Sequence, residues 1–249
     1  MNLERIIAVR TAKTVYRDED KCVKLFDSDY SKAEVLNEAL NQARIEETDL
    51  AIPKILEVTK ANGKWAIVSE YISGKTLDRL MEENPDKENE YLDIFIKAQI
   101  DVHARKSPLL NKLKDKMSRR LFKAGLEPAV LYDLHTRLES LPQDLKICHG
   151  DFNPSNIIIG EKGTPYILDW VDAAQGTPAA DAARTYLLFW LAGNITMADK
   201  YLDSYCRKSN VSKSEVQKWI PLAAASQLAE GKEEEREFLL YWINVVDYE

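Results

Sequence analysis

The first 70 residues alternate short apolar runs with charged turns, a pattern typical of a β-sheet. Strands are expected over residues 6–9, 14–16, 22–26, 55–59 and 65–68. Asn62-Gly63 predicts the turn of a hairpin between the last two strands. Apolar residues at helical spacing from Val35 to Ala43 follow Ser31 and Glu34, which have the spacing of a capping box. This part therefore predicts a small β-rich lobe with one helix.

After Gly74 the apolar positions follow the period of an α-helix. Helices are expected over residues 92–103, 113–121 and 130–138, and again from Asp181 onward. Thr177-Pro178 fits a helix start, and Pro221 is expected to open a later helix. A β-hairpin interrupts the helices, with strands over 156–159 and 165–168. The pattern predicts an α+β fold with an N-terminal lobe, 1–72, and a mainly helical lobe, 73–249.

Composition narrows the class of protein. The chain has 249 residues, of which 45% are hydrophobic and 30% charged, as in soluble globular proteins. With 34 Lys and Arg against 41 Asp and Glu, the net charge is −7, which argues against a nucleic-acid partner. The longest apolar stretch, near residues 186–192, is far below the ~20 residues that span a bilayer. Three scattered cysteines without a CxxC pair favour a cytoplasmic protein over a disulfide scaffold.

One segment combines the residue types that phosphoryl transfer needs. His149, Asp151 and Asn156 form an H-x-D-x-x-x-x-N pattern, and Asp169 follows 13 residues after Asn156. Transfer to a hydroxyl needs a carboxylate that orients and accepts the proton, and oxygen ligands that hold Mg²⁺ against the nucleotide phosphates. Asp151 is the candidate base, and Asn156 and Asp169 are the candidate metal ligands. Each residue alone is better explained by turn chemistry, but their order around a hairpin favours a kinase.

The stretches HGDFNPSNIII and YILDWVDAAQGTPAADAARTYLLF resemble the catalytic segment of the aminoglycoside phosphotransferase and choline kinase-like family. The resemblance implies a bilobal protein-kinase-like fold, ATP or GTP as donor, Mg²⁺, and a small-molecule hydroxyl as acceptor. It also implies that Asp181 braces the catalytic loop, although a negative charge favoured near a helix N-terminus explains Asp181 equally well. Asn153 stands where the family often has His, outside the metal and base set.

The kinase interpretation requires nucleotide-binding residues in the first lobe. A strand lysine must reach the phosphates and a helix glutamate must hold it there. Lys24 suits the first role and Glu38 the second, with Glu34 as the alternative. The connector after the fifth strand resembles the family's hinge, so the backbone C=O of Glu70 and N–H of Ile72 are expected to face the base.

The expected phosphate loop, residues 10–16, contains no glycine, although close backbone approach to phosphates favours glycine. The hydroxyls of Thr11 and Thr14 and the Lys13 ammonium are possible substitutes, and Thr14 is included among the nucleotide-binding candidates. The missing glycine also keeps open a second interpretation, a nucleotide-binding pseudokinase that acts through protein contacts.

The acceptor is not identified by the sequence. Asp172 and the acidic segment 233–237 suggest an amine-bearing acceptor, aminoglycoside-like or choline-like, on charge alone. A protein kinase is disfavoured because only 12 residues separate Asp169 from Asp181, which leaves no room for a peptide-docking segment. His103 and His135 fall in helical patterns and are interpreted as packed or surface residues rather than catalysts.

Overall fold

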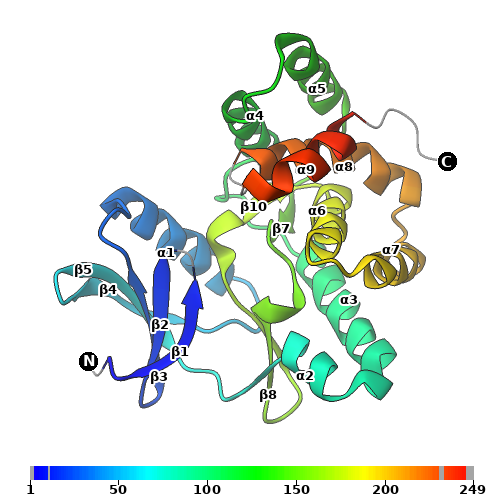
Figure 1. Cartoon of the computed structure of the whole chain (residues 1–249). Helices are drawn as coiled ribbons and strands as arrows, with labels where there is room; N and C mark the ends of the chain where they lie inside the picture. The colour runs from blue at the N-terminus through cyan, green and yellow to red at the C-terminus, as the bar shows by residue number, and fades with distance from the viewer. Residues whose placement is uncertain (1–2, 11, 230–232, 245–249) are drawn as a thin grey trace. The chain divides into compact units, whose positions relative to one another are not determined.

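The computed structural model describes residues 3–10, 12–229 and 233–244, which form two compact units (Figure 1). Unit 1 consists of Met1–Glu88 and Pro154–Asp172, and unit 2 of Asn89–Asn153 and Ala173–Glu249. The hairpin after residue 154 packs with the N-terminal strands and therefore belongs to unit 1. The functional boundary between residues 72 and 73 stays a prediction.

The main sheet of unit 1 is antiparallel, in the order β1-β2-β3-β5-β4. Its elements, which confirm the strands and the helix expected from the sequence, are β1 (Arg5–Arg10), β2 (Lys13–Asp18), β3 (Lys21–Phe26), α1 (Lys32–Glu46), β4 (Ile55–Ala61) and β5 (Lys64–Glu70). Asn62 and Gly63 have φ of 50° and 77°, as a two-residue hairpin turn requires. The capping box of α1 is present, with the Glu34 N–H donating to Ser31 Oγ and the Ser31 N–H donating to the Glu34 carboxylate.

Side chains alternate between the two faces of this sheet. On one face Phe26 and Ile67 pack with Val35 and Ala39 of α1. On the other face four buried residues form a separate cluster, Val23, Leu25, Ala66 and Val68. Lys24 lies opposite Ile67 in the register, so its side chain shares the α1 face.

A second sheet, in the order β6-β8-β9, joins the returning segment to the N-terminal part of unit 1. The remaining elements of this unit are β6 (Gly74–Thr76), α2 (Leu77–Glu83), η1 (Pro85–Lys87), η2 (Pro154–Asn156), β8 (Ile157–Gly160), β9 (Pro165–Ile167) and η3 (Trp170–Asp172). Gly74 allows β6 and β8 to approach closely, since a Cβ there would lie 2.2 Å from the Ile159 carbonyl oxygen. The predicted hairpin is confirmed, and this pairing fixes it to unit 1.

Unit 2 is mainly helical. Its elements are α3 (Glu88–Ala104), α4 (Leu113–Lys123), α5 (Pro128–Ser140), β7 (Lys146–Cys148), β10 (Ala174–Gly176), α6 (Pro178–Leu191), α7 (Ile195–Ser209), α8 (Lys213–Leu228), η4 (Glu233–Glu235) and α9 (Arg236–Ile243). Its core includes Phe95 against Phe152, with ring centroids 4.8 Å apart, and Phe95 against Tyr201 at 5.8 Å.

One expectation about a helix start is wrong, and a second is confirmed without the capping bond. Pro221 does not open a helix but lies inside α8, which begins at Lys213 with a capping box between Ser212 and Glu215. Burial of the helix from Trp219 to Ala225 compensates for the backbone hydrogen bond that proline cannot donate. Thr177 does precede α6, with Pro178 in the first turn, but its side chain makes no capping hydrogen bond.

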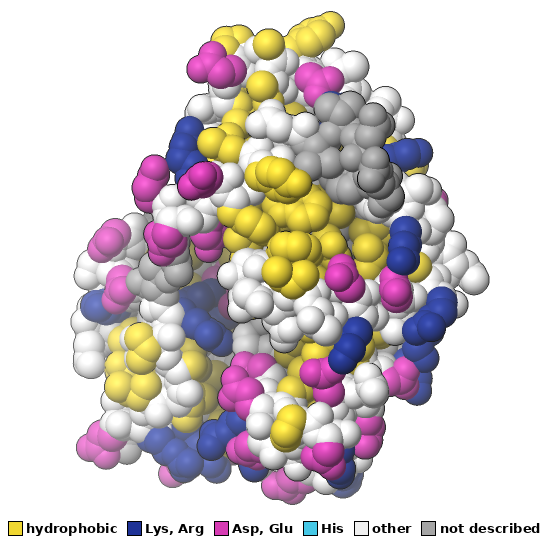
Figure 2. All heavy atoms as spheres, turned by 45° about the vertical axis from the view of Figure 1, so that its right-hand side comes forward, with side chains coloured by type: hydrophobic (Ala, Val, Ile, Leu, Met, Phe, Trp, Pro, Cys, Tyr) yellow, Lys and Arg dark blue, Asp and Glu magenta, His cyan; other side chains and the backbone are white. Residues whose placement is uncertain are grey.

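The α+β fold class expected from the sequence is confirmed, with a β-rich N-terminal part and a mainly helical C-terminal part. No helix among the described residues has the length and apolar character needed to cross a membrane. Figure 2 shows acidic and basic side chains interspersed over the face in view, in keeping with the modest net charge of −7.

Candidate active site

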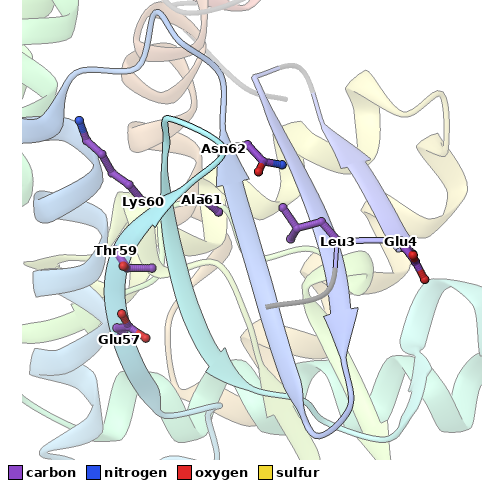
Figure 3. A pocket seen from close by; sticks show the side chains of 7 residues that line it. All are labelled: Leu3, Glu4, Glu57, Thr59, Lys60, Ala61 and Asn62. Atoms are coloured by element: carbon purple, nitrogen blue, oxygen red, sulfur yellow. The ribbon is translucent and has the colours of Figure 1, made fainter.

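A cavity of about 460 Å³ in unit 1 collects most of the candidate residues. It is lined by Lys24 of β3, by Glu70 and Ile72 at the end of β5, and by Asn156 and Asp169 of the returning segment. Residues from two distant parts of the sequence therefore meet at one cavity. A larger depression of about 660 Å³ opens on the other face of the main sheet, near Leu3, Glu57 and Ala61, and contains none of the candidates (Figure 3).

Lys24 lies between two carboxylates. Its Nζ donates to Glu38 Oε1 at 2.5 Å and to Asp169 Oδ1 at 3.2 Å. Glu38 is only 2% exposed. The contact expected between Lys24 and Glu38 is present, while the alternative, Glu34, belongs to the capping box of α1. The network thus holds the lysine in one place from two sides.

The charges in this network favour the ionised forms of Lys24 and Asp169. Burial alone would lower the pKa of Lys24, but the carboxylates of Asp169 and Glu38 outweigh it and hold that pKa above its ordinary value. Burial would raise the pKa of Asp169, but the ammonium groups of Lys24 and Lys13 hold it well below its ordinary value. Asp169 is therefore a carboxylate at neutral pH, the form that binds a metal ion.

Lys13, rather than Thr14, brings its side chain to this cavity. Its Nζ lies 3.3 and 3.4 Å from the two Asp169 carboxylate oxygens and 3.5 Å from each carboxylate oxygen of Glu38. Because side chains alternate along β2, Lys13 and Val15 line the cavity and Thr14 lies on the opposite face, paired with Leu25. Thr11 lies outside the described residues.

The two candidate metal ligands flank the open end of the β8–β9 hairpin. The Leu168 N–H donates to the Asn156 backbone oxygen at 2.8 Å, which sets Asn156 beside the strand that leads to Asp169. Asp169 has a positive φ of 61°, which aspartate tolerates better than most residues. The buried Trp170 follows, and its Nε1–H donates to the Ile167 oxygen at 3.1 Å. The turn that holds Asp169 is therefore fixed on both sides.

One amide oxygen and one carboxylate suit a magnesium ion that takes its other ligands from phosphates and water. Among the described residues, no group of three or more His, Cys, Asp and Glu side chains could hold a metal ion alone. Asn156 and Asp169 line the same cavity, so their donor atoms fit an ion that arrives with a polyphosphate.

The expected hinge is anchored on one side. The Glu70 N–H donates to the Lys54 oxygen at 2.9 Å, and the Glu70 carboxylate accepts from the Lys54 N–H at 3.0 Å. The Tyr71 N–H donates to the Asp20 oxygen at 2.9 Å. No described residue accepts a hydrogen bond from the N–H of Ile72, which lines the cavity. Ile72 can therefore offer its N–H to a ligand.

The candidate base, Asp151, belongs to unit 2 and follows Gly150, whose φ is 84°. The Asp181 carboxylate accepts from the His149 N–H at 3.1 Å and from the Gly150 N–H at 2.7 Å, so the expected brace of this loop is present. Burial would raise the pKa of Asp181, but hydrogen bonding and charge from His103 lower it.

A buried chain of polar groups extends this brace. His103 Nε2 lies 3.0 Å from Asp181 Oδ2, and His103 Nδ1 lies 2.9 Å from the Tyr205 hydroxyl. Since a carboxylate only accepts, the His103 Nε2–H donates to Asp181. His103 is a packed residue, as expected, but it also connects α3 and α7 to the loop around Asp151, the expected catalytic loop. The sequence offered one signal for this role, a histidine on the apolar face of its helix.

Asn153, which the sequence placed outside the base set, contacts the candidate base Asp151 directly. Its Nδ2 donates to Asp151 Oδ2 at 3.2 Å and to the Asp151 backbone oxygen at 3.1 Å. The Thr185 hydroxyl holds the next turn by donating to the Phe152 oxygen at 3.0 Å. The side chain of Asp151 is thus oriented from within its own loop.

Comparison with known proteins identifies the family of the chain. Residues 4–216 match the model of the Phosphotransferase enzyme family, and the chain belongs to that family. A search of curated proteins finds no match.

Solved structures of similar fold include three relevant examples. Aminoglycoside phosphotransferase APH(4)-Ia has 13% identity and a TM-score of 0.69, covering 95% of this chain and 90% of its own. Choline kinase LicA from Streptococcus pneumoniae has 16% identity and a TM-score of 0.65, covering 96% and 94%. A thermostable APH(4)-Ia mutant in ternary complex with AMP-PNP and hygromycin B has 14% identity and a TM-score of 0.62, covering 95% and 90%. At these identities the likeness shows the fold, which is that of aminoglycoside phosphotransferases and choline kinase.

Proposed function

We propose that this protein transfers the γ-phosphate of ATP or GTP, in the presence of Mg²⁺, to a hydroxyl group of a small molecule. The observation that carries the proposal is the buried network of Lys24, Glu38 and Asp169 at a cavity that Asn156 also lines. A fixed lysine beside an ionised aspartate suits a nucleotide polyphosphate with its metal ion.

In this proposal Lys24, held by Glu38, contacts the nucleotide phosphates. Asn156 and Asp169 would hold Mg²⁺, which would neutralise negative charge on the nucleotide phosphates. The C=O of Glu70 and the N–H of Ile72 face the base.

Asp151 takes the role of base. It orients the acceptor hydroxyl and takes its proton, while the acceptor oxygen bonds to the γ-phosphorus. The bond from the γ-phosphorus to the β–γ bridging oxygen breaks, and the nucleoside diphosphate leaves. Asn153 keeps the Asp151 carboxylate in position through its hydrogen bond to Oδ2.

The acceptor class is part of the proposal. Among the similar structures, one protein binds AMP-PNP and hygromycin B and another is a choline kinase. An amine-bearing alcohol is therefore our first candidate, with Asp172 as a candidate contact. If Asp172→Asn leaves the Michaelis constant of the identified acceptor unchanged, Asp172 has no part in its recognition. We place the reaction in the cytoplasm because the cysteines are scattered and free, as is typical of a reducing compartment.

The first experiment is calorimetric titration of wild type and Asp169→Ala with Mg·AMP-PNP and with Mg·GMP-PNP. We expect wild type to bind at least one nucleotide, and Asp169→Ala to bind it at least about tenfold more weakly. Absence of binding to either nucleotide by folded wild-type protein would overturn the proposal.

A second experiment separates catalysis from binding. Hydroxylated amines and sugars are screened for phosphate acceptance, with Asp151→Asn as the inactive control that still binds nucleotide. Binding without transfer to any acceptor would favour the pseudokinase, which the glycine-free loop keeps as the second candidate.

A further inference from the structure

We propose that, when no nucleotide is bound, Lys13 forms an ion pair with Asp169, the proposed metal-binding carboxylate. When Mg²⁺ and nucleotide bind together, the Lys13 ammonium moves to the nucleotide phosphates. Lys13 would thus make metal binding depend on the nucleotide. This inference rests on the function proposed above, and extends it to a residue outside the expected lysine–glutamate pair.

The first observation is the position of the ammonium group. Lys13 Nζ contacts both carboxylate oxygens of Asp169, at 3.3 and 3.4 Å, whereas Lys24 contacts only Oδ1. A metal ion at Asp169 needs the same oxygen lone pairs. Lys13 and a metal ion therefore compete for Asp169.

The second observation is the balance of charge. Two ammonium groups, Lys13 and Lys24, face two carboxylates, Glu38 and Asp169, so the group is neutral by itself. Its four side chains are all at most 22% exposed, which limits screening by water. A divalent cation without a nucleotide would be repelled by the two neighbouring ammonium groups, because the two carboxylates already balance their charge. A polyphosphate brings further negative charge.

The third observation is the glycine-free loop. Residues 10–16 contain no glycine, so close approach of several backbone N–H groups to a phosphate is not favoured there. Within this segment Lys13 begins β2 and lines the cavity, with a side chain 13% exposed. A long, flexible ammonium side chain at this point can reach either Asp169 or a phosphate. Lys13 supplies by its side chain the contact that a glycine-rich loop supplies by its backbone.

The test uses Lys13→Met, which removes the charge and retains the length of the side chain. Lys21→Met is the matched control, since Lys21 is an exposed lysine on the neighbouring strand β3 outside the cavity. Mn²⁺ binding without nucleotide is measured by electron paramagnetic resonance of the free ion. Binding of Mg·AMP-PNP is measured by calorimetry, and circular dichroism checks the fold of each variant.

We expect Lys13→Met to bind free Mn²⁺ about tenfold more tightly than wild type and Mg·AMP-PNP about tenfold more weakly. Lys21→Met should match wild type in both measurements. Adding Asp169→Asn to Lys13→Met should abolish the gain in Mn²⁺ affinity, which assigns the gain to this carboxylate. Lys13→Gln replaces Lys13→Met if the methionine variant does not fold.

An Mn²⁺ affinity equal to that of wild type in a folded Lys13 variant overturns the inference, even if nucleotide binding is weakened. That result leaves the proposed function intact as long as wild type binds Mg·AMP-PNP. Failure of wild type to bind the nucleotide overturns the proposed function instead, and the inference with it.

Discussion

At the scale of single residues, the orientation of Asp151 depends on a neighbour two positions away. Asn153 Nδ2 donates to one carboxylate oxygen of Asp151 and to its backbone oxygen. This arrangement restrains the Asp151 carboxylate, as the proposed base, which must receive a proton along a fixed direction, requires.

We therefore expect Asn153→Ala to lower kcat about tenfold, because a hydrogen bond to a charged group is lost. The affinity for Mg·AMP-PNP should stay at the wild-type value, since Asn153 does not line the nucleotide cavity. Phosphate release in steady state measures the first quantity, and calorimetry the second. A parallel loss of nucleotide affinity would mean that Asn153 supports the loop as a whole rather than the base.

The candidate residues differ in how far the sequence could predict their positions. The contact of Lys24 with Glu38 could be predicted because the lysine lies in an apolar strand and the glutamate in the helix that follows it, the order that a kinase requires. Lys13 was not singled out over Thr14, because alternation along a strand tells which residues share a face but not which face meets the cavity. The contact of Asn153 with Asp151 depends on the turn after Asp151, which leaves no periodic signal.

At the scale of secondary-structure elements, Asp181 connects α6 to the catalytic loop and, through His103, to α3. Its pKa is lowered in the folded protein by hydrogen bonding and charge from His103, against the effect of burial. A carboxyl whose folded pKa lies below its unfolded value of about 3.9 stabilises the fold fully above that pH. The contribution is lost as the pH falls through the folded pKa.

Asp181→Asn should consequently reduce the free energy of unfolding at pH 7 by about 3 kcal/mol, and flatten its decline below about pH 4. Urea unfolding at several pH values from 7 downward measures both effects. Asp133→Asn is the control, an exposed carboxylate that pairs with Arg137 on α5 and should change stability by under about 1 kcal/mol. An acid decline in Asp181→Asn as steep as in wild type would contradict the assigned pKa shift.

The helix starts permit a second comparison. Ser212 caps α8 by accepting from the Glu215 N–H at 3.2 Å, whereas the Thr177 side chain makes no capping bond to α6. We expect Ser212→Ala to cost about 1 kcal/mol of unfolding free energy, and Thr177→Val, which keeps the shape of the buried side chain, to cost less. Denaturant unfolding of the two variants side by side measures the difference. Equal losses would show that the capping bond of Ser212 adds nothing.

Elements with a long periodic pattern, and the short β8–β9 hairpin marked by its apolar runs and glycine turn, were predictable from the sequence, whereas the other short strands were not. The strands β1 to β5 and the helices α3, α4 and α5 agree with their apolar spacing. The three-residue strands β6, β7 and β10 are too short to show any period, and they form only because partner strands supply their hydrogen bonds. The helix start predicted at Pro221 was wrong. Proline is favoured in the first turn of a helix, but the burial of α8 outweighs this local preference.

At the scale of the whole molecule, the chain passes out of unit 1 after Glu88 and returns at Pro154. The cavity takes Lys24 and Glu70 from the first passage and Asn156 and Asp169 from the second. The two passages are joined by the pairing of β6 with β8, where Gly74 lies opposite Gly160. A ligand in this cavity would therefore contact two segments that are distant in the sequence.

We expect Mg·AMP-PNP to slow amide hydrogen exchange in both segments together, most in peptides that contain β3 and in those that contain β8 and β9. A ligand that binds only the folded state raises the free energy of unfolding, by about 2.7 kcal/mol at a concentration one hundred times its Kd. Local opening of the segments that contact the ligand is suppressed by the same linkage. Exchange measured by mass spectrometry, with and without nucleotide, gives the change for each segment, and Lys24→Met is the matched variant in which protection should be largely lost. Protection of the N-terminal strands without the β8–β9 hairpin would contradict the metal-binding role of Asn156 and Asp169, because nucleotide would then bind through unit 1's first passage alone.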